Sequence, residues 1–318
     1  MDRCAVRALA LTSLLMACGS PPPPKPPPPP VSLPADAGVV EARRDFALPT
    51  APMALAVAGT ALVWTDTAGA IWTMPAAGGD PKQLSDQHSH KFAFHPVVAG
   101  GRVFVTTKRD FYAVALPAGP VTALGAKLPE DPEEAVGDDH YLYVTLFKRN
   151  EVMRVPIDGG AATKLFDFPR GVLAIHGGTL YAASYSTGVL VAAPTAGGAP
   201  KSIARGLDHP TAVAADDTYA FVYTERDKTL HRITLASGAT TVLATGLDNA
   251  DDVVAHDDYV YTYSWGHPGR LLRIAKTGGE PQVLAADLAS PRSIVIAGGA
   301  VYLTSRDNNL IVRAALPL

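Results

Sequence analysis

The chain has 318 residues, of which 47% are hydrophobic and 18% are charged, so it has ample material for a large core. Its formal net charge is −3 and it has no cluster of Lys and Arg. This excludes the usual nucleic-acid-binding surface, which needs clustered cations. The two cysteines, Cys4 and Cys18, both lie near the N-terminus. We therefore expect no disulfide, catalytic thiolate or Cys-ligated zinc in the folded domain.

Residues 1–17 have the composition of a bacterial export signal, with two arginines before an apolar run over residues 8–16. The run is shorter than the roughly 20 residues that a membrane-spanning helix needs. The residues Leu15-Met16-Ala17-Cys18 resemble the lipobox of bacterial lipoproteins, which implies cleavage before Cys18 and acylation of its thiol. In such lipoproteins, Asp directly after the cysteine implies retention in the inner membrane. Here that residue is Gly19, which implies the outer membrane. An ordinary secretory signal cut near the same point is the alternative.

A proline-rich segment follows the cysteine. Nine prolines lie between Pro21 and Pro30, interrupted only by Lys25. Proline fixes φ and lacks the backbone N–H, so we expect an extended polyproline II spacer with a rise of about 3.1 Å per residue. We assign residues 18–38 to a lipidated tether and residues 39–318 to one domain.

That domain is a repeat of short apolar strands bounded by Gly, Asp or Pro. Each unit contains four strands, and its second strand has a central aromatic residue. The spacings between these aromatics are 40, 39, 38, 40, 40 and 41 residues, over Trp64, Phe104, Tyr143, Tyr181, Phe221, Tyr261 and Tyr302. This pattern predicts an all-β, seven-bladed β-propeller with four-stranded blades. The second unit is weak, which leaves six or eight blades as alternatives.

The ends of the domain predict how the ring closes. The last unit reaches Leu318 after only three strands, and residues 39–48 precede the first unit without belonging to it. We expect this N-terminal segment to supply the fourth strand of the last blade, which removes an open sheet edge.

The residues Val63-Trp64-Thr65-Asp66 match a YWTD motif except for Val in place of Tyr, and residues 154–160 and 273–279 resemble the second half of that repeat. Residues 39–318 therefore resemble bacterial YWTD-like β-propeller lipoproteins, within the broader group that includes TolB-like propellers. The resemblance implies the fold. It says little about function, and the YWTD domains of receptors usually have fewer blades than we count here.

Charged residues occupy one position of the repeat, at the start of the innermost strand. Innermost strands surround the central channel, so we expect these residues to ring its mouth. Three interpretations remain open: the arginines neutralise the acids in a structural network, which we favour, the acids bind one Ca²⁺ or Mg²⁺ ion, or they contact a ligand directly. The residues are Glu133, Glu134, Asp251 and Asp252 in the third and sixth units, and Arg170 and Arg292 in the fourth and seventh.

Loops on the same side of the ring carry the aromatic residues Phe147, Tyr185 and Trp265. Aromatic and Arg side chains supply much of the energy of protein interfaces. We therefore predict a non-enzymatic binding or scaffold protein of the cell envelope, whose loop face takes a protein, peptide or glycan. It would contact the membrane through its lipid anchor, bind no nucleic acid and need no cofactor.

Two other functions remain open. One is a divalent-cation-dependent hydrolase or lyase at the channel mouth, using the four acids and His209. The other is an envelope-assembly scaffold similar to the propeller lipoprotein of outer-membrane barrel insertion. No nucleophile elbow, P-loop or dinucleotide motif is present, so we assign no catalytic residue.

Two further patterns have simpler explanations. The pairs at Asp138, Asp216 and Asp257 occupy a slot that is Gly-Gly in other units, which favours turn geometry over metal binding. A histidine cluster at residues 88–95 is a weak candidate for a metal site, because it has no obvious carboxylate partner. We leave the metal unassigned.

Overall fold

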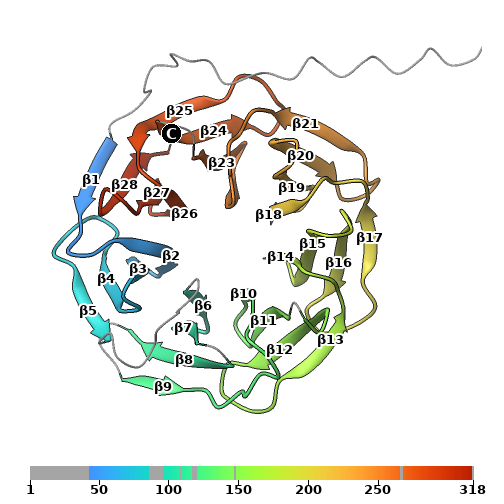
Figure 1. Cartoon of the computed structure of the whole chain (residues 1–318), viewed down its shortest axis with the longest axis horizontal. Helices are drawn as coiled ribbons and strands as arrows, with labels where there is room; N and C mark the ends of the chain where they lie inside the picture. Colours follow the sequence, from blue (N-terminus) through green and yellow to red (C-terminus); the bar gives the residue numbers. More distant parts are fainter. Residues whose placement is uncertain are drawn as a thin grey trace, which may run out of the picture.

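The computed structural model describes residues 43–85, 96–107, 109–116, 120–146, 148–265 and 268–316. In this part of the chain, 28 β-strands form seven four-stranded antiparallel sheets, arranged as blades around a central channel (Figure 1). The predicted seven-bladed propeller is confirmed. No helix in the described ranges is long and apolar enough to cross a membrane.

In blades I to VI, four consecutive strands run from the channel outwards (Figure 1). Blade I contains β2 (Pro52–Ala58), β3 (Ala61–Asp66), β4 (Ile71–Pro75) and β5 (Lys82–Ser85), and blade II contains β6 (Val97–Ala99), β7 (Arg102–Thr107), β8 (Asp110–Ala115) and β9 (Val121–Ala123). Blade III contains β10 (Glu134–Gly137), β11 (Tyr141–Leu146), β12 (Glu151–Pro156) and β13 (Thr163–Asp167), and blade IV contains β14 (Gly171–His176), β15 (Thr179–Ser184), β16 (Leu190–Pro194) and β17 (Lys201–Ala204).

The numbering continues through the last three blades. Blade V contains β18 (Pro210–Ala215), β19 (Tyr219–Thr224), β20 (Thr229–Thr234) and β21 (Thr240–Ala244), and blade VI contains β22 (Val253–His256), β23 (Tyr259–Ser264), β24 (Gly269–Ala275) and β25 (Gln282–Leu288). Blade VII contains β26 (Pro291–Ala297), β27 (Ala300–Ser305), β28 (Leu310–Ala315) and the N-terminal strand β1 (Arg43–Ala47).

The second strand of each blade forms the centre of the core. In β3, β11, β15, β19 and β23 every residue after the first is buried. Successive side chains of a strand point to opposite faces, so a strand buried on both faces packs against a neighbouring blade on each side. This explains why these segments are nearly continuous apolar runs.

Seven hydrophobic clusters fill the spaces between neighbouring blades in the described chain. The repeated aromatics belong to them: Trp64 and Tyr302 meet between blades I and VII, and Phe221 lies between blades V and VI. A blade has no core of its own, so burial of its apolar faces requires the closed ring.

Strand β1 closes the ring, as predicted. It pairs antiparallel with β28, from Arg43 opposite Ala314 to Ala47 opposite Leu310. Phe46 of β1 is buried in the cluster that contains Trp64 and Tyr302. The N-terminal strand therefore supplies both hydrogen bonds and apolar contacts to the last blade. It lies beside β28 in Figure 1.

The direction of β1 follows from this pairing. We define the mouth as the end of the central channel at which the innermost strands β2, β14, β18 and β26 begin. Strands alternate in direction across blade VII, so β28 also begins at the mouth and β1 ends there. The chain consequently enters β1, at Arg43, on the face opposite the mouth.

Candidate functional site

A cavity of about 780 Å³ opens at the mouth. Its wall combines the first residues of innermost strands with residues from the loops after the second strands. The lining residues of greatest chemical interest are Met53, Glu133, Glu134, Arg170, Tyr185, Glu225, Asp251, Tyr263, Arg292 and Arg306. Acids and arginines from blades III to VII thus meet around one space.

On the wall formed by blades III to V, the charges are paired. Arg170 Nε donates to Glu133 Oε1 at 2.5 Å, and the Arg170 guanidinium lies 4.9 Å from the centre of the Tyr185 ring. The Tyr185 hydroxyl donates to Glu225 Oε2 at 3.1 Å, and this hydrogen bond raises the pKa of Tyr185. A continuous chain of contacts therefore joins the three blades.

His209 supports this wall from outside the cavity lining. Its ring packs edge-on against Tyr185, with centres 4.8 Å apart, and its Nδ1 lies 2.7 Å from Asp208 Oδ1. The backbone of His209 has φ +61°, a left-handed conformation that non-glycine residues seldom adopt.

The wall formed by blades VI and VII is built differently. Burial raises the pKa of the Asp251 carboxyl and the negative charge of Glu225 adds to the shift, whereas Thr211 and the charge of Arg292 oppose it. Asp251 nevertheless keeps exposed surface within the cavity. The Arg292 guanidinium lies 4.2 Å from the centre of the Trp265 ring, and burial lowers the pKa of Arg292.

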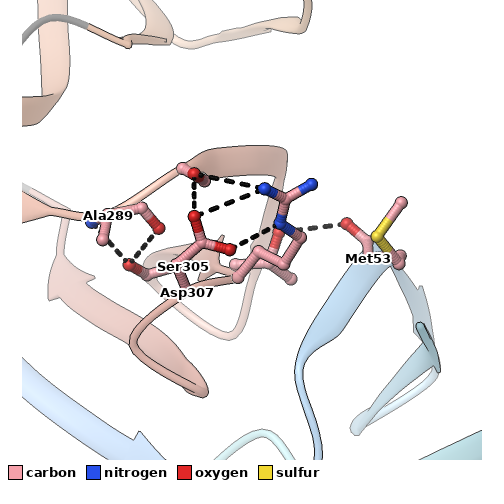
Figure 2. Close-up of polar contacts among 7 residues, drawn as sticks. Met53, Ala289, Ser305 and Asp307 are labelled. Atoms are coloured by element: carbon pink, nitrogen blue, oxygen red, sulfur yellow. Dashed lines mark hydrogen bonds and ion pairs between the residues drawn. The ribbon is translucent and has the colours of Figure 1, made fainter. Parts of the chain in front are cut away.

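Arg306 completes this wall at the seam between blades VII and I. Arg306 Nε donates to Asp307 Oδ1 at 2.7 Å, and hydrogen bonds from Arg306 and Ser290 lower the pKa of Asp307 to about 2. Figure 2 shows Asp307 in this network and Ser305 against Ala289, whose backbone N–H and C=O both bond the Ser305 hydroxyl at 3.1 Å.

The same view shows how the seam is fixed to blade I. The carbonyl oxygen of Met53 accepts a hydrogen bond of 3.2 Å from the Thr304 hydroxyl (Figure 2). Met53 itself lines the cavity. These contacts hold the loop that carries Arg306 against the start of β2.

The residues predicted to ring the mouth are brought together only in part. Glu133, Glu134, Arg170, Asp251 and Arg292 all line the cavity, and so does the loop residue Tyr185. The predicted network of acids and arginines takes the form of an ion pair at Arg170 and of longer-range attraction at Arg292.

Asp252 is not among the lining residues and faces the neighbouring blade. Its Oδ2 accepts a hydrogen bond of 3.0 Å from the backbone N–H of Ile294. Trp265 lies behind Arg292 and also stays outside the lining, whereas Phe147 is outside the described residues.

Sequence reasoning did not single out three of the lining residues. Glu225 and Arg306 lie in polar loop segments, and no feature of the sequence distinguishes them from the charged residues beside them. Tyr263 lies two residues after the blade aromatic Tyr261, and this spacing places both side chains on the same face of β23. That pattern was available in the sequence.

The residues were also tested as a metal site. Within the ranges that the structure describes, no group of three or more His, Cys, Asp or Glu side chains lies close enough to hold a metal ion. The histidine cluster at residues 88–95 lies outside those ranges.

The acid pairs in the turns act as the turn hypothesis predicts. Asp138 Oδ1 accepts hydrogen bonds of 2.8 Å from the backbone N–H groups of His140 and Tyr141. Asp216 Oδ1 does the same for Thr218 and Tyr219. These carboxylates order the turns on the face opposite the mouth.

No protein-family model matches the chain, and no curated protein matches it. Its fold is similar to that of a catalytically inactive variant of virginiamycin B lyase from Staphylococcus aureus, determined with quinupristin, with a TM-score of 0.72 and 14% identity over 87% of this chain and 99% of that one. A streptogramin B lyase structure gives 0.70 and 15% over 87% and 98% of the two chains.

A chain of a nidogen–laminin complex gives a TM-score of 0.51 with 18% identity, over 60% of this chain and 79% of that one. These likenesses show a shared fold and no family. The resemblance to YWTD-like lipoproteins is therefore supported for the propeller itself and assigns no membership.

Proposed function

We propose that this protein is an outer-membrane lipoprotein, anchored through Cys18, whose central cavity binds a peptide without catalysing a reaction. The observation that carries the proposal is the composition of the cavity wall, in which carboxylates and guanidinium groups line one space of about 780 Å³. Binding sites for small ligands have volumes of roughly 300–1,000 Å³. A short peptide segment fits this range, whereas a folded protein would meet only the rim.

The wall favours a peptide over a glycan. Sugar rings commonly pack on the open faces of aromatic side chains. Here Arg170 covers one face of Tyr185, and Arg292 covers one face of Trp265. The cavity lining also carries charge of both signs, which suits a chain with charged ends and many polar backbone groups.

Equilibrium binding tests this proposal. Fluorescence anisotropy of the 39–318 domain with a labelled library of random tetrapeptides should give saturable binding, and a glycan array should not. The variant Glu225→Gln removes a lining charge, and Glu280→Gln, which changes a residue outside the lining, is the matched control. Saturable binding to the array alone would assign the cavity to glycans, and no binding in either assay would contradict the proposal.

The alternative is a metal-dependent lyase or hydrolase at the same cavity. It is favoured by the likeness in shape to two lyases and by the carboxylates at the mouth. A resident cation at about 100 times its Kd should stabilise the fold by about 2.7 kcal/mol. We expect Ca²⁺ and Mg²⁺ titrations to leave the melting temperature unchanged. A shift that Asp251→Asn abolishes would instead support the metal site.

A further inference from the structure

Two halves of the mouth use equivalent positions of the repeat in different ways. Glu133 and Arg170 open the innermost strands of blades III and IV, and Asp251 and Arg292 hold the same positions in blades VI and VII. The first acid and arginine form an ion pair at 2.5 Å. Among the described residues no ion pair joins Asp251 to Arg292, although both line the cavity.

Arg292 is held in place by contacts that leave its charge without a carboxylate partner. Its guanidinium stacks on Trp265, and the Tyr263 hydroxyl donates to its backbone carbonyl oxygen at 2.9 Å. Its Nε is buried and has no hydrogen-bond partner among the described residues. Arg306 lies in the same wall, but Asp307 already pairs with it.

Asp251, in turn, has no cationic ion-pair partner among the described residues. Its carboxylate keeps exposed surface within the cavity, where the charge of Glu225 repels it and the charge of Arg292 attracts it. Opposite charges attract more strongly in a partly enclosed site than in bulk water, because they are screened less. This wall therefore presents to the same cavity a carboxylate and a guanidinium group that no ion pair joins in the described part of the chain.

We propose, as a refinement that rests on the peptide-binding function, that the wall formed by Asp251 and Arg292 binds a zwitterionic ligand. The ammonium group of the ligand lies at Asp251, where it also offsets the charge of Glu225. Its carboxylate lies at Arg292, since guanidinium groups bind carboxylates strongly. The ligand class is a free amino acid or a short peptide with both termini unblocked.

The geometry disfavours ligands with only one of the two charges. A lone carboxylate at Arg292 would place a further negative charge near Asp251, and a lone ammonium at Asp251 would place a positive charge near Arg292. Like charges in a partly buried site repel with little screening. The wall formed by Glu133 and Arg170 does not require a ligand with both charges, because its own charges already neutralise each other.

Isothermal titration calorimetry on the 39–318 domain tests the charge requirement. The probes are alanine, Ala-Ala dipeptide, N-acetyl-Ala-Ala and Ala-Ala amide, which separate the free amino acid from the peptide and each terminal charge from the other. We expect the dipeptide or the amino acid to bind at least tenfold more tightly than either blocked peptide.

Two variants assign the charges to residues. Arg292→Met should bind Ala-Ala and Ala-Ala amide equally, and Asp251→Asn should bind Ala-Ala and N-acetyl-Ala-Ala equally. Arg170→Met is the matched control at the equivalent position and should keep the preference for free termini. If Arg292→Met fails to fold, Arg292→Lys retains the charge and should retain the preference.

The outcomes separate this inference from the broader proposal. Equal binding of free and blocked peptides by the unmodified domain would overturn the zwitterion site and leave peptide binding in place. Loss of the preference in Arg170→Met but not in Arg292→Met would move the site to the opposite wall and also overturn the inference. Absence of binding by every probe and by the tetrapeptide library would contradict both.

Discussion

Asp251 and Asp252 are adjacent in sequence and have opposite effects on the fold. Asp252 accepts a backbone hydrogen bond from blade VII, whereas Asp251 faces the cavity and carries a raised pKa. Neighbouring residues of an extended chain point to opposite sides, so one position of the doublet serves packing and the other is available to a ligand.

We predict that Asp251→Asn raises the melting temperature at pH 7. The folded-state pKa of Asp251 lies above its unfolded value, so its ionised form costs stability at neutral pH. The gain should shrink as the pH falls through the folded-state pKa towards the unfolded value of 3.8, because the native carboxyl then becomes neutral too. Thermal melts at pH 4 and pH 7 measure this.

The matched variant is Asp252→Asn, which weakens the charge-assisted hydrogen bond to Ile294 N. It should destabilise the fold by about 1 kcal/mol. A lower melting temperature for Asp251→Asn at pH 7 would contradict the assignment of an uncompensated charge at that position.

A buried histidine sets a second pH dependence. His231 Nε2 lies 3.0 Å from the Thr224 hydroxyl, and burial lowers the pKa of His231 although Asp227 opposes the shift. The folded-state pKa lies below the unfolded value of 6.5, so stability should be complete above pH 6.5 and decline as the pH falls from there towards the folded pKa.

Urea denaturation between pH 5 and pH 7 measures this decline, and His231→Gln should flatten it. An equal slope in the variant would place the pH dependence elsewhere. Thr224 has no exposed surface, so the cluster of Thr224, His231 and Asp227 is a structural network within blade V.

The sequence predicted which residues reach the mouth better than how they pair there. Equivalent positions of the repeat located Glu133, Arg170, Asp251 and Arg292 correctly around one channel. Arg170 stacks on Tyr185 and forms an ion pair, whereas Arg292 stacks on Trp265 and forms none among the described residues; the repeat specifies neither these loop side chains nor the pairing.

At the scale of the element, β1 pairs with β28, which lies at the other end of the domain in sequence. It was predictable by counting, because the last unit lacks one strand. Blade II shows the limit of the repeat: β6 and β9 have only three residues each, so their short pattern left the number of blades open until the ring was seen to close.

We predict that deletion of residues up to Leu48 destabilises the domain by several kcal/mol or causes aggregation. It would remove the pairing with β28 and the buried side chains of Phe46 and Leu48, and expose a sheet edge. Deletion up to Pro34 removes only the proposed signal and most of the tether, so it should leave the melting temperature unchanged. Equal melting temperatures for the two truncations would exclude a structural role for β1.

At the scale of the whole molecule, the mouth and the start of β1 lie on opposite faces of the ring. The chain therefore enters the domain on the face opposite the cavity. The repeat in the sequence predicts the ring. The face that the tether leaves from depends on the direction of β1, which the pairing with β28 determines.

We predict that Cys18→Ser moves the protein from the membrane fraction to the soluble fraction. Each buried CH₂ of an acyl chain contributes about 0.8 kcal/mol, so several chains hold a protein firmly at a bilayer. Fractionation in high salt, followed by immunoblotting, measures the shift. Sedimentation of the variant with membranes would contradict lipidation at this residue.

The direction of β1 also determines how the domain responds to mechanical load. A pull on the N-terminus acts along the axis of β1, away from the mouth, whereas the hydrogen bonds to β28 run across the strand. The paired residues from Arg43 to Ala47 then resist in shear and share the force, instead of separating one after another. If a bound ligand pulls on the tethered domain, the load on β1 therefore acts in shear, the direction in which its pairing with β28 resists best.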